Sequence, residues 1–484
     1  MSAASSRVLL SGAHVVSLDD AVGELTGDVL VEDGKIAAVA AGLDAPDAER
    51  LDLSGDIVLP GFVDTHRHTW QTPFRGVCAD WTLEEYFRGI RMTVSPNCSA
   101  EDVYAGNYVG ALEALDAGVT TLLDFSHCNN TPEHADAALA GLRDSGIRAT
   151  FAYGYFPAMV AEPVFTEHEQ RLADARRIRE LLPSDDSLVT MGIALTECGL
   201  VPFEQTAAEV RSARELGVPT VLHTGCAWGG LVTQGLPELD HHGLLGSDQV
   251  HVHCNTLDER DFRRLAEHDC KISSSPETEL QMGMGHPVIG RALAHGMRPS
   301  LSCDVMSSNS GDMFAQMRLG LQFERAMAND RDNARGRMPE RLSLGVRDAL
   351  RWGTANGAHA IGLEDRIGSI TVGKQADLIV VGGGRLNMTP MADPVGCLVA
   401  QANPSNVTHV LVAGRFVKRD GELCGADVPR AVQLGQQAWE RVQGRIADQG
   451  LQLLPPAPEG FTDAINTVAA TNLARAWGMA PEGS

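Results

Sequence analysis

The stretch Pro60-Gly61-Phe62-Val63-Asp64-Thr65-His66-Arg67-His68 decides the fold, because an apolar strand runs there directly into His-x-His. Alternate residues of an extended chain point the same way, so His66 and His68 can share one target while Arg67 faces elsewhere. Imidazole nitrogen suits a borderline divalent ion such as zinc. Active sites of parallel (β/α)8 barrels form at the carboxyl ends of the strands, so the stretch predicts a first barrel strand that carries metal ligands.

Seven further apolar or β-branched runs follow this strand, and helical patterns separate them. The runs span residues 120–125, 147–154, 189–196, 219–223, 250–253, 271–275 and 300–303, with helical stretches at 101–117, 132–145, 166–182, 206–216 and 258–268. Eight strands with intervening helices predict an α/β fold, a (β/α)8 TIM barrel over residues 60–362. A doubly wound open sheet is the alternative, and it is disfavoured because no Gly-x-Gly-x-x-Gly follows the first strand.

Short strands recur at both ends of the chain, outside the barrel. They are predicted within residues 7–59 and again at 376–381 and 409–417, with Gly-marked turns between them. Two small β segments that flank a long middle predict one β domain built from both termini, residues 1–59 and 363–424. The remaining residues, 425–484, are predicted to form a helix at 430–448 and a C-terminal tail.

Three later strands also end in residues that can bind a metal or carry a proton. His223 ends the run 219–223, His253 ends 250–253, and Asp304 follows 300–303. A single His on an apolar strand is usually a hydrogen-bonded core residue, but an ionised Asp buried beside a strand end is costly unless a cation accompanies it. Four such strand ends in one chain predict a shared site at the mouth of the barrel.

The composition argues against some classes of partner. Among 484 residues, 39 Lys and Arg stand against 63 Asp and Glu, giving a formal net charge of −24, which repels nucleic acid and anionic membranes. The ten cysteines form no Cys-x-x-Cys pair, and no apolar stretch resembles a membrane span or a cleaved leader. These features predict a cytoplasmic protein with reduced thiols and a small-molecule substrate.

The motifs resemble those of the amidohydrolase superfamily, and they occur in the order of that family over nearly the whole chain. The resemblance rests on residues 60–68 and 113–121, on Asp304, on Thr354-Ala355-Asn356-Gly357-Ala358 and on residues 368–378. Within the superfamily the chain is similar to the branch of cytosine, guanine and 8-oxoguanine deaminases and the s-triazine hydrolases, because of Arg75-Gly76 and Asp80-Trp81-Thr82-Leu83 in the first barrel loop.

The resemblance implies a distorted barrel, a terminal β-sandwich, a homo-oligomer, and one divalent ion per subunit held by His66, His68, His223 and Asp304. Zinc is favoured over iron and manganese, and one ion over two, because the fourth strand, residues 189–196, has no lysine that could be carbamylated to bridge two metals. Asp304 is then also the general base, and His253 orients the water or stabilises the charge that develops on oxygen. The implied reaction is hydrolysis of a C–N bond, either deamination of an amidine-like ring carbon or cleavage of an amide or imide.

One departure from the branch bears on the choice between these reactions. The branch usually carries His-x-x-Glu after strand five, where the Glu protonates a ring nitrogen, whereas this chain has His223-Thr224-Gly225-Cys226. Glu277, after strand seven, or Glu197, after strand four, could supply the missing acid. Two alternatives stay open: an amide hydrolase acting on a peptide-like or secondary-metabolite substrate, and a barrel that serves as a non-catalytic scaffold.

The loops after the first two strands hold further candidates for substrate contact. Trp70, Gln71 and Trp81 could stack on or hydrogen-bond a planar ligand, although core or lid packing would explain them equally well. Arg75 could bind a carboxylate or carbonyl group, or form a structural salt bridge. His127, after the second strand, and Glu197 complete the residues predicted to contact substrate.

Overall fold

A parallel eight-stranded sheet, closed into a barrel, forms the centre of the molecule in a computed structural model that describes residues 7–157, 160, 162–184, 186–226 and 235–476. Its strands are β6 (Phe62–Arg67), β7 (Val119–Ser126), β8 (Arg148–Gly154), β9 (Val189–Ala194), β10 (Thr220–Thr224), β11 (Gln249–His253), β12 (Lys271–Ser274) and β13 (Ser300–Leu301), and they pair in sequence order. The sequence prediction of a TIM barrel is confirmed.

The barrel closes between the first strand and the residues just after the last. The His68 amide donates to the Asp304 carbonyl at 2.8 Å, and the Asp304 amide donates to the His66 carbonyl at 3.0 Å. These two bonds flank a parallel bridge between Arg67 and Asp304. Ring closure therefore joins two segments that both carry candidate metal ligands.

Hydrophobic side chains fill the barrel below the site. Leu123 and Phe125 of β7 and Val250 and Val252 of β11 alternate along their strands and belong to one buried cluster, which α12 (Ala355–Ala360) also joins. The interior is thus a packed core, as in other barrels of this kind, and it leaves only the carboxyl ends of the strands for chemistry.

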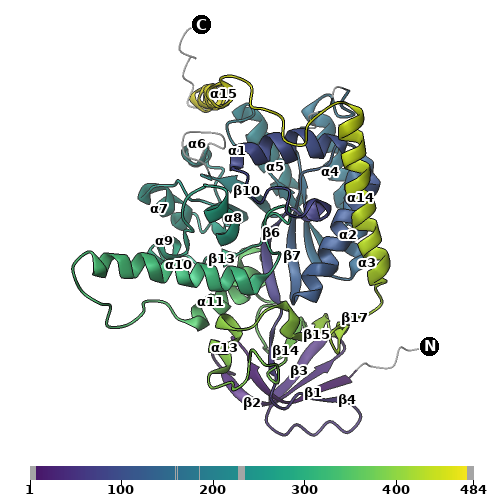
Figure 1. Ribbon diagram of the computed structural model, residues 1–484, viewed down its shortest axis with the longest axis vertical. Coiled ribbons are helices and arrows are strands. Elements are labelled where there is room, and N and C mark those ends of the chain that lie inside the picture. Colours follow the sequence, from purple (N-terminus) through teal and green to yellow (C-terminus); the bar gives the residue numbers. More distant parts are fainter. Residues whose placement is uncertain (1–6, 158–159, 161, 185, 227–234, 477–484) are drawn as a thin grey trace.

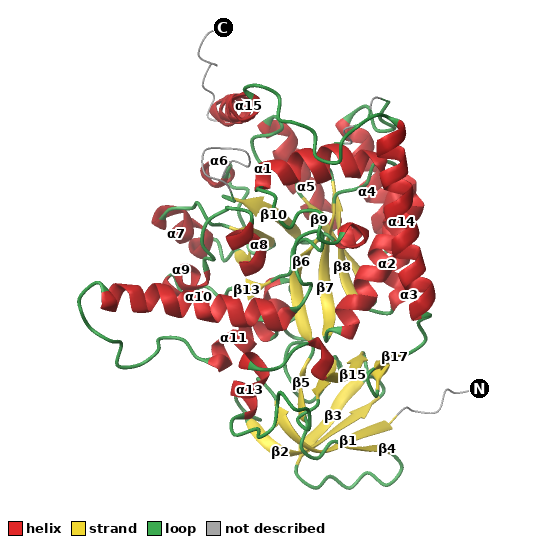
Figure 2. Ribbon diagram, in the orientation of Figure 1, coloured by secondary structure: helices red, strands yellow, loops and turns green. Residues whose placement is uncertain are grey.

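Helices surround the barrel, as Figure 2 shows in red. They are α2 (Ala100–Asp116), α3 (Pro132–Ser145), α4 (His168–Leu181), α5 (Phe203–Leu216), α6 (Leu236–His241), α7 (Glu259–Glu267), α8 (Pro276–Gln281), α9 (Ile289–Ala294), α10 (Met313–Asn333) and α11 (Val346–Trp352). The sequence fixes several of their ends: Ser99 and Asp102 form a capping box that starts α2, and Gly146, at φ 77°, ends α3 in the left-handed region.

The loop after β6 is long and partly helical. It contains the 3-10 helix η1 (Thr69–Phe74), α1 (Leu83–Tyr86), the π-helix η2 (Phe87–Val94) and the 3-10 helix η3 (Ser95–Asn97). Wide helical turns of the π type are uncommon and occur often at functional sites.

The second domain is a mixed sheet below the barrel that combines strands from both ends of the chain (Figure 1). Its strands are β1 (Arg7–Val16), β2 (Glu24–Glu32), β3 (Lys35–Ala40), β4 (Glu49–Asp52), β5 (Ile57–Pro60), β14 (Leu378–Val381), β15 (Val407–Val412), β16 (Arg415–Arg419) and β17 (Glu422–Leu423). Antiparallel pairing of β5 with β14 joins the two halves. A domain built from both termini is what the sequence predicts.

Three more helices complete the C-terminal part. After α13 (Pro394–Ala400) and the short η4 (Pro404–Asn406), α14 (Val428–Asp448) packs along α2, where Arg441 Nε donates to Asp102 Oδ1 at 2.8 Å. Beyond α14 the sequence predicts only a tail, but the structure has a further helix there, α15 (Phe461–Ala476). This helix lies at the end of the molecule opposite the terminal sheet (Figure 1), and Asn472 Nδ2 donates to the Gly199 carbonyl at 2.9 Å. Among the described helices, we find none with the length and apolar character needed to cross a bilayer.

Candidate metal and active site

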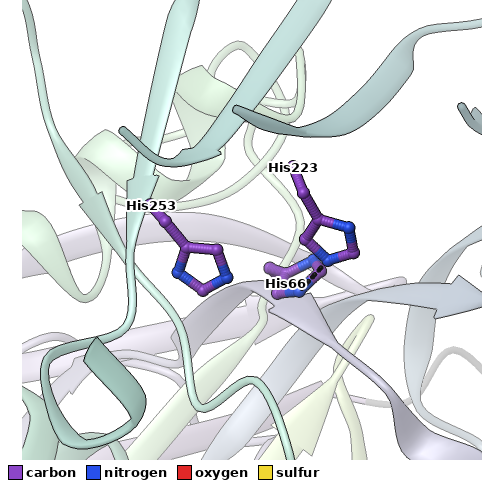
Figure 3. A group of neighbouring side chains, drawn as sticks. All are labelled: His66, His223 and His253. Carbon is purple, nitrogen blue, oxygen red and sulfur yellow. Dashed lines mark hydrogen bonds between the residues drawn. The ribbon is translucent and has the colours of Figure 1, made fainter. Parts of the chain in front are cut away.

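Four imidazoles and one carboxylate meet at the carboxyl end of the barrel. His66 Nε2 lies 3.1 Å from Asp304 Oδ1 and 3.3 Å from His223 Nε2. His68 Nε2 lies 3.4 Å from Asp304 Oδ1, and His253 Nε2 lies 3.8 Å from Asp304 Oδ2. Figure 3 shows His223 and His253 side by side above His66, with the close pair marked. The residues come from β6, β10, β11 and the end of β13, so the fold brings together every strand end that the sequence singled out.

Three of the four imidazoles are held from behind at Nδ1, which turns Nε2 toward the centre of the cluster. Nδ1 of His68 lies 3.1 Å from the Phe125 carbonyl, Nδ1 of His223 lies 3.3 Å from Glu197 Oε1, and Nδ1 of His253 lies 3.3 Å from Glu279 Oε1. A hydrogen bond from Nδ1–H to an acceptor leaves the Nε2 lone pair free for a metal and fixes the orientation of the ring.

Burial favours the neutral, metal-binding form of His66, His68 and His223. Loss of solvent lowers the pKa of His66 and lowers that of His68 further below its usual value. Burial also lowers the pKa of His223 to about 4, although the neighbouring Glu197 opposes the change. Burial alone would raise the pKa of Asp304, but the hydrogen bond with His66 and the electrostatic influence of His66, His253 and His223 together outweigh that effect and bring the pKa to about 2. An anionic carboxylate among neutral imidazoles is a donor set ready for a cation.

The backbone is strained where two of these residues stand. His253 (φ 75°), Cys254 (φ 59°) and Asp304 (φ 60°) all adopt the left-handed region, which is unfavourable for residues other than glycine. Such outliers persist where the surrounding structure over-determines them and concentrate at functional sites. Here they direct the ends of β11 and β13 into the barrel mouth.

The donor set fits a divalent ion. Ligand atoms of His66, His68 and Asp304 lie within 4.8 Å of one another, and so do those of His66, His223 and His253. Nε2 of His66 and Nε2 of His223 face each other at 3.3 Å. Neutral imidazoles packed this way are under-satisfied without a cation, which is the reason the group suits a borderline ion such as zinc.

A cavity of about 30 Å³ opens beside the cluster. It is lined by the candidate ligands His68, His223 and Asp304, by His253, and by Leu83, Tyr86, Phe87, Arg91, Glu197, Cys226, Thr278, Met282, Met284 and Val305. Of the residues predicted to contact substrate, Glu197 is the one that lines this cavity.

Three others of that set, Trp70, Gln71 and His127, support the cluster from outside. Trp70 Nε1 donates to His127 Nδ1 at 2.9 Å, and the His127 ring stacks on His68 with centroids 4.2 Å apart. Gln71 Nε2 donates to the Tyr86 hydroxyl at 2.7 Å, and Gln71 Oε1 accepts from Ser307 at 2.8 Å. These residues position cavity-lining side chains.

The remaining predicted contacts lie away from the cavity. Arg75 Nη1 donates to Glu113 Oε1 at 2.6 Å in a half-exposed ion pair, and Trp81 packs against Gly89 of η2. Glu277 Oε2 accepts from Gln316 Nε2 at 2.5 Å and from Ser310 Oγ at 2.9 Å. The structure therefore does not bring Glu277 to the imidazoles.

Sequence reasoning missed three residues that reach the site: Arg91, Tyr86 and Glu279. Glu279 stands two residues after Glu277 on α8, and two helical steps turn a side chain by about 200°. Glu279, and not the predicted Glu277, therefore faces His253. A helix predicted over Pro276–Gln281 would have shown that Glu277 and Glu279 point in different directions. Arg91 and Tyr86 belong to no sequence motif.

Comparisons with known proteins agree with this geometry. Residues 57–417 match the amidohydrolase family. The 5'-deoxyadenosine deaminase of Methanothermobacter thermautotrophicus is 26 % identical over 464 residues, covering 90 % of this chain and 99 % of that protein. The 5-methylthioadenosine/S-adenosylhomocysteine deaminase of Syntrophobacter fumaroxidans is 28 % identical, covering 90 % of this chain and 98 % of that protein.

A solved structure with bound zinc is also similar. The adenosine deaminase of Xanthomonas campestris superposes with a TM-score of 0.79 at 25 % identity, covering 91 % of this chain and 99 % of the other. The resemblance to the deaminase branch is thereby confirmed. This chain belongs to the amidohydrolase family, and it is a metal-dependent hydrolase that acts on C–N bonds.

Proposed function

We propose that this chain is a deaminase that hydrolyses the exocyclic C–N bond of an adenine-type ring in a small nucleoside. The observation that carries the proposal is the convergence of His66, His68, His223, His253 and Asp304 at one end of the barrel. Relatives that span nearly the full chain are named as deaminases of adenine nucleosides, which supports the substrate class.

We further propose one divalent ion per subunit, zinc in preference to iron or manganese, held by His66, His68, His223 and Asp304. A nitrogen-rich donor set favours zinc, and the described β9 offers no lysine for a second metal. Bound there, the ion would supply Lewis acidity that lowers the pKa of water and polarises the electrophile.

We propose that Asp304 carries the proton. Its Oδ1 faces His66 and His68, whereas Oδ2 lies toward His253, 3.8 Å from Nε2. Oδ2 would take a proton from the attacking water and pass it to the departing nitrogen, and His253 Nε2 would orient the water. Water adds to the ring carbon, the C–N bond breaks, and the products are ammonia and a ring carbonyl.

In this proposal Glu197, which lines the cavity, does not replace the acid missing from His-x-x-Glu. Burial alone would raise the pKa of Glu197, but the charge of Arg91, together with the hydrogen bond and the electrostatic influence of His223, outweighs that effect and brings the pKa to about 2. Glu197 is therefore anionic and accepts hydrogen bonds. Burial raises the pKa of the Cys226 thiol, so that group stays neutral. We therefore propose Asp304, rather than Glu197, as the proton carrier of this site.

The test is ammonia release from adenosine and 5'-deoxyadenosine by the metal-loaded protein. Wild-type protein should release ammonia, and Asp304→Asn should lower kcat by about 100-fold or more, because general acid–base catalysis contributes that much. Circular dichroism and metal analysis check that the variant stays folded and loaded. Ammonia release by Asp304→Asn at the wild-type rate would rule out Asp304 as the base.

A separate variant tests the other candidate acid. Glu277→Gln removes a carboxylate that Gln316 and Ser310 hold outside the cavity. Wild-type turnover in Glu277→Gln would remove this residue from the mechanism, and a large loss of kcat would restore it.

Amide hydrolysis is the second candidate function, and one observation favours it. Cys226 lines the cavity three residues after His223, where the deaminase branch usually has its proton-donating Glu. Release of a carboxylate without ammonia, from a panel of small amides, would support this reaction over deamination.

A further inference from the structure

Arg91 is a buried cation beside the active site that neither the sequence motifs nor the mechanism above assigns. Arg91 lies on the π-helix η2, is only 3 % exposed to solvent, and lines the cavity with its side chain. The guanidinium carbon lies 3.9 Å from the centre of the Phe156 ring and 5.8 Å from that of Phe87. These contacts hold the guanidinium plane in a fixed position.

Its hydrogen bonding is incomplete. Arginine carries five N–H donors, but the one hydrogen bond of Arg91 to a described residue runs from Nη1 to Glu197 Oε1, at 3.4 Å. Within the described part of the chain, Nη2 of Arg91 and Oε2 of Glu197 are both buried without a partner. Buried polar groups left this way are unfavourable, so a donor and an acceptor are both ready for a ligand.

Arg91 and Glu197 lie next to the candidate metal site. Glu197 Oε1 lies 3.3 Å from Nδ1 of His223, a candidate metal ligand, so a single carboxylate separates Arg91 from the metal site. A substrate whose reacting carbon sits at that site would place its ring, rather than a distant substituent, against Arg91. The wide turn of η2 brings the residue there, as π-helical segments often do for functional side chains.

We propose that Arg91 is a specificity-determining residue that donates a hydrogen bond from Nη2 to an acceptor nitrogen of the substrate ring. Glu197 Oε2 accepts from a donor on the same molecule. Because Glu197 balances the charge of Arg91, the pair selects a neutral heteroaromatic ring with an acceptor and a donor rather than an anion. The inference rests on the proposed function, since it names how that site recognises its substrate.

The experiment measures binding to the metal-loaded full-length protein by calorimetry, with adenosine and its 1-deaza, 3-deaza and 7-deaza analogues as probes. The wild-type sequence at position 91 and all variants are compared in an Asp304→Asn background, so that turnover does not consume adenosine during the titration. Each analogue replaces one ring acceptor by C–H. The variants are Arg91→Met and Arg91→Lys. Arg88→Met is the matched control, since it removes the same charge from the same helix, but Arg88 contacts Glu84 and the Pro455 carbonyl instead of the cavity.

Wild-type protein and Arg88→Met should bind one analogue at least about 10-fold more weakly than adenosine, the cost of a hydrogen bond to a charged group. Arg91→Met should bind adenosine and that analogue equally, and Arg91→Lys should restore part of the difference. An unchanged preference in Arg91→Met, or equal binding of all four probes by the wild type, would overturn the proposal. Ammonia release is measured in a separate assay. An absence of ammonia would count against the proposed function, whereas the binding data would still test what Arg91 recognises.

Discussion

Nδ1 of His223 lies 3.3 Å from Oε1 of Glu197, so a carboxylate that follows β9 orients an imidazole at the end of β10. The same arrangement recurs between His253 and Glu279 one strand further on. A carboxylate behind an imidazole fixes the tautomer and strengthens the nitrogen as a ligand. The binding of metal at this site should therefore depend on residues that never touch the ion.

Glu197→Gln tests this dependence. The amide keeps the shape of the side chain but removes the charge behind His223, so metal affinity should fall by roughly 10- to 100-fold. Competition with a chromophoric chelator measures the change. Glu204→Gln, at an exposed position of α5, is the matched control and should bind metal as the wild type does. Equal affinity in all three proteins would show that Glu197 does not act through the metal site.

His66→Ala should lose the metal. His66 Nε2 lies within 3.3 Å of both Asp304 and His223, so its removal takes away the central nitrogen of the cluster. We expect metal content well below one ion per subunit by atomic emission. His251→Ala, a change of the same kind at a buried histidine whose Nδ1 pairs with Thr224, should keep its metal. Unchanged stoichiometry in His66→Ala would remove this residue from the ligand set.

The strand ends of the site were predictable because each carries a local signal. Alternation places His66 and His68 on one side of a strand, and parallel strands bring distant ends such as His223 and Asp304 to one edge. Apolar or β-branched runs separated by helical stretches likewise predict the barrel, and short strands with Gly-marked turns predict both halves of the terminal sheet. These inferences need only the geometry of extended chains.

The cavity wall could not be predicted in this way. Arg91 lies in a long loop whose π-helical turn depends on tertiary packing. No periodic pattern in the sequence predicts this turn. Glu277 and Glu279 are equally plausible in sequence, and only the rotation of α8 distinguishes them. The sequence predicts a tail in place of the helix α15, because this segment follows a proline-rich stretch and lacks a strong apolar stripe.

Asp377→Ala should destabilise the protein by about 3–5 kcal/mol, because it leaves a buried arginine without its partner. Arg148 on β8 donates to Asp377 from Nε at 2.6 Å and from Nη2 at 3.0 Å, and the Ala413 amide donates to the same carboxylate at 2.7 Å. Denaturant unfolding measures the loss. The pair links the barrel to the segment that precedes β14.

Two comparisons make that prediction specific. Adding Arg148→Met to Asp377→Ala should restore part of the lost stability, since the unpaired charge is then gone. Arg298→Ala breaks the half-exposed pair with Glu364 and should cost at most about 1 kcal/mol. Equal losses from Asp377→Ala and Arg298→Ala would contradict a buried, structural role for Asp377.

Glu209→Gln should flatten the dependence of stability on pH. Burial raises the pKa of Glu209 from 4.5 to about 7, against hydrogen bonds from Thr196 and Gln205. Between these two pH values the unfolded chain releases the proton while the folded chain keeps it, so the free energy of unfolding falls as pH rises, by up to about 3 kcal/mol. Glutamine does not titrate, and the variant lacks this loss. Urea unfolding from about pH 5 to about pH 7.5 measures the free energy of unfolding of the three proteins. The value for the wild type should fall relative to that of Glu209→Gln as pH rises, and it should run parallel to that of Glu204→Gln. If the curves of wild type and Glu209→Gln ran parallel, Glu209 would be ionised in the folded protein across the whole range.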